Sequence, residues 1–268
     1  MKELQLTHSF SDSPVSLAYV HEGESSTETG ITLPLVQAEL MFCLHGDFKL
    51  LPPTTSETTP KTTFFGLFTQ PMLATVAGPF SMAGVFLHPQ GFYQLTGQSV
   101  AAYKNQAVDA QLIWGKSIQQ LYEKLRLATA SERIGLLENF ISQQPRYPLH
   151  PRVMVALDWL KQAEGGQDLV FRLAKTLKVS EKTVHADFKR EIGLSPVIYQ
   201  LLQRFQRSLG QLQTSDLNLS TLAHELDYYD QAHFIKRFSA FAQMTPGEYR
   251  KSMQEMTKNQ NPHYLTQR

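Results

Sequence analysis

Residues 219–250 read LSTLAHELDYYDQAHFIKRFSAFAQMTPGEYR, and this stretch decides the fold of the C-terminal half of the chain. Ala223 stands near the end of a first short apolar helix, a turn begins at Asp227, and Phe234 and Phe238 follow four residues apart. A small residue where two helices cross, followed by apolar residues at i and i+4, is what a tight helical corner requires. The stretch therefore predicts a helix-turn-helix unit.

The same pattern occurs earlier, between Asp168 and Tyr199. Ala174 takes the place of Ala223, and Phe188 precedes a Ser-Pro pair by the same interval that separates Phe238 from a Thr-Pro pair. Between the two units, apolar residues recur at helical spacing from Pro196 to Leu212, which predicts one long connecting helix. Two such units in tandem are typical of a protein that presents two helices to successive major grooves of DNA, about 34 Å apart.

Charge divides the chain in the same way. Residues 1–145 carry 8 Lys and Arg against 12 Asp and Glu, a net charge of −4, whereas residues 146–268 carry 17 against 12, a net charge of +5. A basic half joined to a mildly acidic half is typical of a nucleic-acid reader attached to a sensing or assembly domain. The difference only supports this interpretation, because helical domains rich in ion pairs often reach such a charge.

The N-terminal half predicts strands and turns up to about residue 90. Short apolar runs such as Glu39–Leu44 and Met82–Leu87 are separated by clusters of Gly, Pro, Ser and Thr. Helical spacing follows in Ala110–Leu127 and Ser131–Ser142, with Ser131 as the expected N-cap. Three prolines in Gln143–Pro151 end this pattern and mark a domain boundary.

The expected fold class is α+β. We expect a small β-rich, barrel-like domain with C-terminal helices in residues 1–145, for sensing or dimerisation. An all-α domain of two helix-turn-helix units joined by a long helix is expected in residues 146–253, and a polar, frayed tail in residues 254–268.

Cys43 is the only cysteine, which excludes an intrachain disulfide and fits a reducing compartment. Met1 begins a polar stretch without the features of a signal peptide. No run approaches the ~18 apolar residues of a membrane span. These observations favour a cytoplasmic protein that does not bind membranes.

The C-terminal residues resemble the tandem DNA-binding domain of the AraC/XylS family of bacterial transcription regulators, from about Leu149 to Met253. The matching positions of the second unit are Asp230, Gln231, His233, Phe234, Arg237, Phe238, Thr245, Pro246, Tyr249 and Arg250. Those of the first are Ala174, Ser180, Phe188, Lys189, Arg190, Gly193, Ser195, Pro196 and Tyr199. The segments LPLVQAELMFCLHGDF, FGLFTQP and GVFLHPQGFYQLTG resemble the β-rich, sensor-like domain at the front of some members, which implies no particular ligand.

The chain departs from this family at its glycines. Lys178 and Asp227 stand in the tight turns where Gly is usual, and Gln243 stands where the first unit keeps Gly193. A non-Gly residue in the left-handed conformation costs roughly 1 kcal/mol, and Asp costs less. Ala232 replaces a common Ser. None of these changes is expected to break the fold, but they weaken the second unit as a base reader.

In each unit the second helix is expected to enter the major groove, with the residues opposite its apolar side facing the bases. The predicted base readers are Lys182, Thr183, His185 and Ala186 in the first unit and Gln231, Ala232 and Lys236 in the second. The candidate phosphate contacts are Lys189, Arg190, Arg204, Arg237 and Arg250. Gln can bond adenine through two hydrogen bonds, Lys can donate to guanine, and Ala can touch only a thymine methyl.

The N-terminal half carries no motif of an enzyme or a metal site. Its histidines lack the His-x-His spacing of a metal-dependent cupin, and neither a nucleophile elbow nor a nucleotide-binding loop is present. We therefore expect no catalysis, no cofactor and no metal. The candidate residues for an effector pocket are Phe42, Phe65, Phe68, Phe86, Phe92 and Tyr93, most of which also fit a plain core.

Three functions remain open. The first is a transcription regulator that binds double-stranded DNA and RNA polymerase, and whose N-terminal domain binds a small effector or forms a homodimer. The second is the same regulator with a ligand-free interaction module. The third is a DNA-repair alkyl acceptor, which requires a reactive Cys43 although that residue has no basic or Cys neighbour along the chain. The effector, the operator, the sign of regulation and the oligomeric state are not specified by the sequence.

Overall fold

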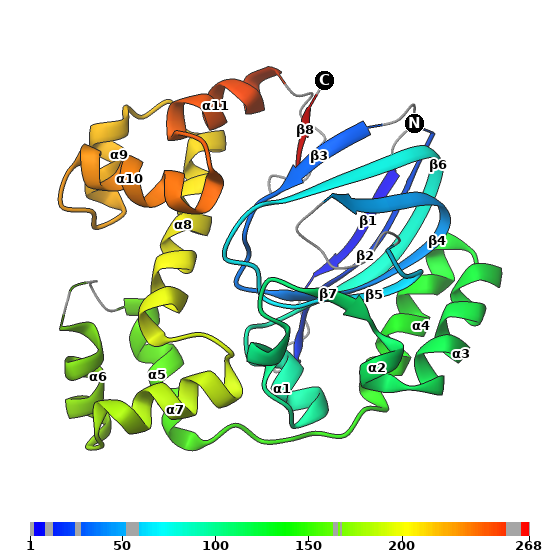
Figure 1. Cartoon of the computed structure of the whole chain (residues 1–268), viewed down its shortest axis with the longest axis horizontal. Helices are drawn as coiled ribbons and strands as arrows, with labels where there is room; N and C mark the ends of the chain where they lie inside the picture. The colour runs from blue at the N-terminus through cyan, green and yellow to red at the C-terminus, as the bar shows by residue number, and fades with distance from the viewer. Residues whose placement is uncertain are drawn as a thin grey trace.

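The computed structural model describes residues 3–8, 13–24, 28–51, 59–162, 166, 168–255 and 264–267. Its N-terminal part is a curved antiparallel sheet with helices, and its C-terminal part is entirely helical up to Glu255 (Figure 1). The α+β fold class is therefore confirmed. Within the described residues, no helix combines the length and the apolar character that crossing a bilayer would need.

The sheet follows the strand order β1-β2-β6-β4-β5-β7. Outside this order, β3 pairs with β6, and β8 pairs with β3. The strands are β1 (Glu3–His8), β2 (Val15–Gly23), β3 (Glu28–Thr32), β4 (Ala38–Leu51), β5 (Thr62–Phe65), β6 (Met72–Leu87), β7 (Ala107–Asp109) and β8 (Tyr264–Gln267). The long strands β4 and β6 bend together, because their register shifts between Cys43 and Asp47. At this bend Gly46 adopts φ +89°, where a Cβ atom would lie 2.7 Å from the Pro79 carbonyl oxygen.

Helices cover one face of this sheet. The segment after β6 forms α1 (Gly91–Thr96), a 3₁₀ turn η1 (Val100–Tyr103), α2 (Gln111–Trp114), α3 (Lys116–Leu127) and α4 (Ala130–Ser142). The predicted single helix over Ala110–Leu127 is wrong, because Gly115 takes φ +59° and separates α2 from α3. The predicted N-cap is also wrong: Thr129 caps α4, and the Glu132 carboxylate accepts from its backbone N–H at 2.8 Å.

Arg133 fastens α4 to the sheet. Its side chain is buried, and its Nη1 donates to Glu22 Oε1 at 2.5 Å and to Ser81 Oγ at 2.9 Å. Its Nε donates to the Leu125 carbonyl oxygen at 3.0 Å, so one guanidinium joins α3, α4, β2 and β6. The Ser81 hydroxyl and the Arg133 guanidinium lower the pKa of Glu22. This network fixes the helical layer on the sheet.

The C-terminal part is built around one long helix. Its helices are α5 (Pro151–Gln162), α6 (Leu169–Leu177), α7 (Glu181–Glu191), α8 (Pro196–Thr214), α9 (Leu219–Glu225), α10 (Gln231–Ala242) and α11 (Pro246–Glu255). Figure 1 shows α5, α6 and α7 at one end of α8 and α9, α10 and α11 at the other. Leu202, Phe205, Leu209 and Leu212 are buried along α8, as the apolar spacing predicted.

The C-terminal tail contains a strand that the sequence did not predict. Tyr264–Gln267 forms β8, which pairs antiparallel with Thr29–Thr32 of β3. Backbone hydrogen bonding to a strand edge therefore holds this part of the tail, whereas we expected a frayed end. Residues 256–263 and 268 of the predicted tail lie outside the described residues.

Candidate nucleic-acid interface

The first helical corner joins α6 to α7 through a left-handed residue. Lys178 has φ +54°, and the next residue, Val179, donates its N–H to the Ala174 carbonyl oxygen at 3.1 Å. Ser180 then caps α7, since its hydroxyl accepts from the Thr183 N–H at 3.1 Å. Ala174 is 4% exposed, so this small residue is buried at the crossing. The turn that the sequence pattern indicated therefore has its expected geometry.

The second corner repeats this geometry between α9 and α10. Asp227 has φ +56°, and Tyr228 donates its N–H to the Ala223 carbonyl oxygen at 2.9 Å. The cap of α10 is Asp230, whose carboxylate accepts from the His233 N–H at 2.7 Å. The two turns share the left-handed residue and this hydrogen bond, although the second is one residue longer, and each positions the N-terminus of the helix that follows.

Each second helix buries one side and leaves the opposite side open. Val184 and Phe188 of α7 and Phe234 and Phe238 of α10 are at most 2% exposed. On the open sides, the structure places Lys182, His185 and Ala186 of α7 and Gln231, Ala232 and Lys236 of α10 as exposed residues, with Thr183 half-buried. All seven predicted base readers therefore lie on two helix faces at opposite ends of α8 (Figure 1).

The five candidate phosphate contacts divide into two groups. Lys189 and Arg237 are exposed, and Arg237 donates from Nε to His233 Nε2 at 3.2 Å. Arg204 is only 5% exposed, and its Nη1 donates to the Asp227 carbonyl oxygen at 3.1 Å while its guanidinium lies over the Tyr228 ring. Its prediction as a phosphate contact is wrong, because it holds the second turn from inside.

Arg190 and Arg250 also have partners within the protein. Arg190 Nη2 donates to Glu191 Oε1 at 2.6 Å and to Asp187 Oδ1 at 3.1 Å, and these carboxylates raise the pKa of Arg190. Arg250 Nη2 donates to the Leu217 carbonyl oxygen at 2.7 Å. Both guanidinium groups are therefore engaged in fixing the fold, which leaves Lys189 and Arg237 as the better phosphate candidates.

The sequence pattern missed Tyr229. This residue is 92% exposed in the turn before α10, whereas its neighbour Tyr228 is 7% exposed and packs on Phe234 at a ring distance of 5.2 Å. Tyr229 directly precedes the Asp230 cap of α10. The sequence does not indicate which of two adjacent tyrosines is buried and which is exposed.

Two acidic residues on the buried side of α7 are fully paired. Arg152 of α5 lies 3.0 Å from the Asp187 carboxylate, and the His150 N–H donates to Glu191 Oε2 at 2.8 Å. These contacts join the linker before α5 to the first corner. Unpaired carboxylates would be costly at this depth, so the pairs fix the position of α7.

The N-terminal part touches the C-terminal end of α7. The Ser99 hydroxyl, just before η1, donates to the Lys189 carbonyl oxygen at 2.5 Å. Gly193, with φ +80°, lies against η1 so closely that a Cβ atom would be 2.4 Å from Val100 Cγ1. Ile192 and Val100 are at most 1% exposed, so this is a packed apolar contact. The helix α7, which carries four of the predicted base readers, is thus in direct contact with the N-terminal part.

The six aromatic residues predicted for an effector pocket do not surround one cavity. Phe42 and Phe92 belong to the core between the sheet and its helices, whereas Phe65, Phe68 and Phe86 belong to a second cluster on the other face of the sheet. Tyr93 of α1 lies near Arg190. The predicted pocket is therefore wrong as a single site, because neighbouring residues of a strand point to opposite faces.

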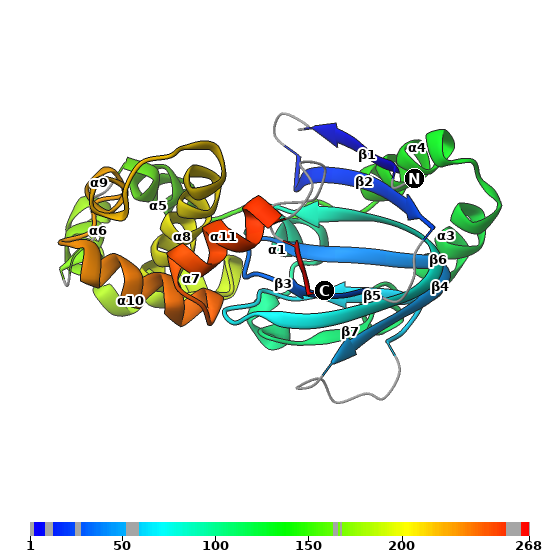
Figure 2. The same cartoon turned by 90° about the horizontal axis from the view of Figure 1, so that it is seen from above.

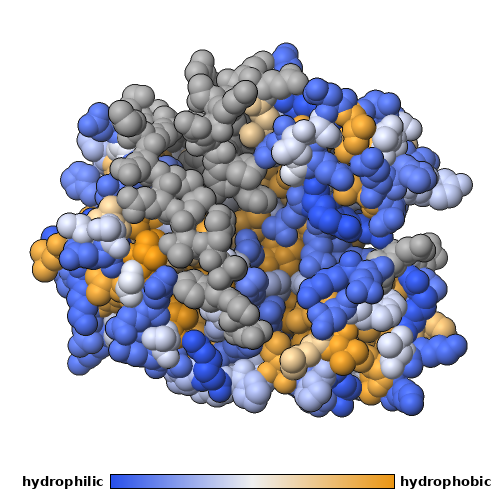
Figure 3. Space-filling view, turned by 180° about the vertical axis from the view of Figure 1, so that it is seen from behind, coloured by the Kyte–Doolittle hydropathy of each residue, from blue (hydrophilic) through white to orange (hydrophobic). Residues whose placement is uncertain are grey.

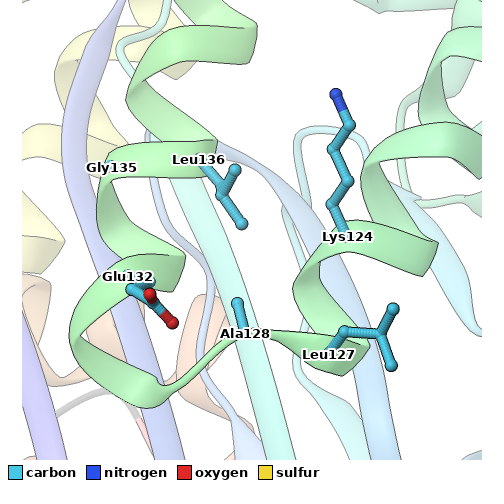
Figure 4. Close-up of a pocket in the computed structure, with 6 residues that line it drawn as sticks. All are labelled: Lys124, Leu127, Ala128, Glu132, Gly135 and Leu136. Carbon is cyan, nitrogen blue, oxygen red and sulfur yellow. The ribbon is translucent and has the colours of Figure 1, made fainter.

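An open hollow of about 590 Å³ lies between α3 and α4 (Figure 4). Its lining residues are Lys124, Leu127, Ala128, Glu132, Gly135 and Leu136, none of which was a predicted site residue. The rear view in Figure 3 shows a surface that is mostly hydrophilic with scattered hydrophobic residues. This hollow is open to solvent and carries no convergent polar groups, so it does not qualify as the effector site.

Cys43 has a basic neighbour that its sequence context concealed. Lys61 Nζ lies 3.9 Å from Cys43 Sγ, yet burial raises the pKa of the thiol. A protonated, buried thiol is a poor nucleophile, which weighs against an alkyl acceptor. Across the described residues, no group of three or more His, Cys, Asp or Glu could hold a metal ion.

Comparison with known families gives two matches. Residues 173–252 match the family described as a helix-turn-helix domain, and residues 15–109 match a domain of unknown function, DUF6597. The first match covers both helical corners. The second covers the sheet as far as β7 and names no activity.

Curated relatives match the same C-terminal part. A protein of Streptomyces lividans described as an AraC-like transcription regulator is 32% identical over 101 residues, which are 38% of this chain and 33% of the relative. An uncharacterized HTH-type transcriptional regulator of Haemophilus influenzae is 29% identical over 122 residues, 45% of this chain and 41% of the relative. The chain thus spans a third to two fifths of the length of these relatives.

Among solved structures, ToxT of Vibrio cholerae O395 is similar over 92% of this chain and 97% of its own, with 9% identity and a TM-score of 0.48. The C-terminal domain of AraT, a response regulator from Geobacillus stearothermophilus, is similar over 43% of this chain and 95% of its own. Its identity is 22% and its TM-score is 0.38.

Proposed function

We propose that this chain, whose C-terminal part is a helix-turn-helix domain of the AraC type, is a sequence-specific regulator of transcription that reads double-stranded DNA. The observation that carries the proposal is the pair of equivalent corners at the two ends of α8, each with one buried and one open helix face. A rigid helix between two reading helices suits two adjacent major-groove segments on one face of the duplex.

The two helices would recognise DNA bases through different side chains. Lys182 and His185 of α7 can donate to base edges, and Gln231 of α10 can make two hydrogen bonds to adenine. Ala186 and Ala232 offer only a methyl group to thymine. Lys189 and Arg237 would neutralise phosphates, which positions each helix without reading sequence.

The test is to select binding sites from random duplex DNA with the full chain and with the variants Lys182→Ala and Gln231→Ala. Each variant should lose about 1–3 kcal/mol of discrimination at one or two defined base pairs. Lys124→Ala, an exposed lysine on α3, is the matched control and should leave the selected sequence unchanged. A uniform loss across all sequences would limit both residues to backbone contact. No salt-dependent preference for any sequence would overturn the proposal.

Control of DNA binding would pass through the contact between η1 and α7. Ser99 and Val100 hold the end of the first reading helix, so a change in the N-terminal part would shift α7 relative to α10. The N-terminal part would bind a small effector or form a homodimer, and the DNA-bound protein would act on RNA polymerase in the bacterial cytoplasm. The alternative, a ligand-free interaction module, would show the same DNA affinity with every small molecule.

A further inference from the structure

The sheet has an inner face that no described helix covers. Strand register puts Tyr19 of β2, Glu39 of β4, Phe65 of β5 and Phe86 of β6 on this face, because Glu39 pairs with both Phe65 and Phe86. Figure 2 shows the strands curving around this side of the sheet, while α3 and α4 lie on the other. The face is therefore formed by the sheet itself.

Glu39 is a carboxylate on this face, near the start of β4, opposite the last residue of β5 and the penultimate residue of β6. The Tyr19 hydroxyl crosses β6 to donate to Glu39 Oε1, and it does so over Gly84, where a Cβ atom would lie 2.7 Å from that hydroxyl. Among the described residues, Tyr19 is the only hydrogen-bond partner of this carboxylate, and Oε2 has none. No described cation pairs with Glu39, whose pKa burial raises to about 7.

Aromatic rings surround the carboxylate. Tyr19 and Phe86 have ring centroids 5.5 Å apart, and Phe48, from the bent end of β4, meets Phe65 edge to face at 6.4 Å. Glu39, Phe48 and Phe86 all keep part of their surface open, whereas Tyr19 and Phe65 are at most 7% exposed. Ring faces and a free carboxylate oxygen are the two groups that recognise an organic cation.

We propose that this inner face binds a small organic cation, whose ammonium or amidinium group donates to Glu39 Oε2 and whose apolar body packs on Tyr19, Phe65 and Phe86. The charge balance supports a cation over a neutral ligand or an anion, because a buried carboxylate without a counter-charge is costly and a second negative charge would raise that cost. The assignment rests on the proposed function in one respect: the cation would be the effector of the regulator.

The experiment uses the full chain and calorimetric titration with 2-phenylethylammonium chloride, with 2-phenylethanol as a neutral probe of the same size. The ammonium should bind about tenfold or more tightly than the alcohol. Glu39→Gln should abolish this preference, since the amide keeps an acceptor for the Tyr19 hydroxyl but loses the charge. Phe86→Leu should lower the affinity for the ammonium compound about fivefold, because it removes an aromatic ring but keeps the Glu39 carboxylate.

Glu24→Gln is the matched control, because Glu24 is exposed just beyond the end of β2. It should leave ammonium binding unchanged. Equal binding of ammonium and alcohol, binding that survives Glu39→Gln, or no saturable binding of the ammonium up to about 10 mM would each overturn the assignment.

DNA affinity for the selected site is measured in parallel, with and without the ammonium. Sequence-specific DNA binding without ammonium binding would refute the cation site alone and leave the proposed function standing. Ammonium binding that requires Glu39, in a chain without any DNA preference, would support the site and refute the regulator.

Discussion

The two helical corners share one turn geometry but are held in different ways. The first corner is fixed from outside its own unit, by Ser99 and Val100 on α7 and by the pairs of Asp187 and Glu191. The second is fixed from within, by Arg204 on the turn at Asp227. The comparison teaches that the N-terminal part directly supports the first corner, whereas the anchor of the second corner lies within the helical part, so a change in the N-terminal part should act first on α7.

Substitutions at Gly193 and at its counterpart in the second corner should have the most different effects on the free energy of unfolding. Gly193→Ala places a Cβ atom 2.4 Å from Val100 in a backbone with φ +80°. We expect a loss of about 2–4 kcal/mol in the free energy of unfolding, measured with denaturant. The equivalent residue of the second corner is Gln243, with φ +55°, and Gln243→Gly should instead gain about 1 kcal/mol.

A control for this pair is Gly210→Ala, because nothing lies within 4 Å of a Cβ atom at Gly210 in α8. That change should be neutral or stabilising. If Gly193→Ala proved equally harmless, the packed contact between η1 and α7 would be absent in solution.

Arg204 tests the internal anchor of the second corner. Arg204→Ala removes the donor to the Asp227 carbonyl oxygen and the cation over the Tyr228 ring. The expected loss is about 2–3 kcal/mol, with hydrogen exchange rising in α10 but not in α7. Arg207→Ala, an exposed residue on the same helix, should stay within about 0.5 kcal/mol. Equal loosening of α7 and α10 would contradict two separate anchors.

The left-handed turn residues allow a finer comparison. Lys178→Gly should stabilise the protein by about 1 kcal/mol, because it relieves a side chain at φ +54°. Asp227→Gly should gain about 0.5 kcal/mol or less, since Asp tolerates this conformation and its carboxylate lies 4.0 Å from Arg204. Thermal melting of both variants checks the order, and a larger gain at Asp227 would contradict it.

Acid should loosen the start of α11 through its carboxylate cap. The Thr245 backbone N–H and hydroxyl donate to Glu248 and lower its pKa below 4.5. A lowered folded pKa means that the contribution is present above pH 4.5 and is lost as the pH falls through the folded pKa. Amide exchange in α11 should therefore rise on acidification, while α8, capped by the Ser195 hydroxyl, should not respond through its cap. Glu248→Gln should remove the pH dependence.

Local patterns predicted the corners well because their determinants are local. The small residue at Ala174, the cap at Ser180 and the apolar pair at Phe234 and Phe238 all act within a few residues of one another. The same spacing identified which sides of α7 and α10 are buried and which are exposed. The role of Arg204 could not be found this way, because its partner Asp227 is distant in the sequence.

The N-terminal part was harder to predict, for two physical reasons. Its aromatic residues were grouped by composition, although strict alternation along β5 already sends Phe64 and Phe65 to opposite faces. The bend at Cys43–Asp47 and the bond between Tyr19 and Glu39 depend on strand register, which pairs residues far apart in the chain. The N-cap of α4 was misplaced by two residues, because Thr129 and Ser131 are both good capping residues.

The pairing of β8 with β3 ties the far end of the helical part back to the sheet. The chain therefore connects this part to the sheet at both of its ends, through the linker that enters α5 and through the strand after α11. Residues 256–263 lie between Glu255 and β8, and the nine Cα–Cα steps from Glu255 to Tyr264 span no more than about 32 Å in a fully extended chain. Moving the end of α11 farther than this from the edge of β3 would therefore require β8 to separate from β3.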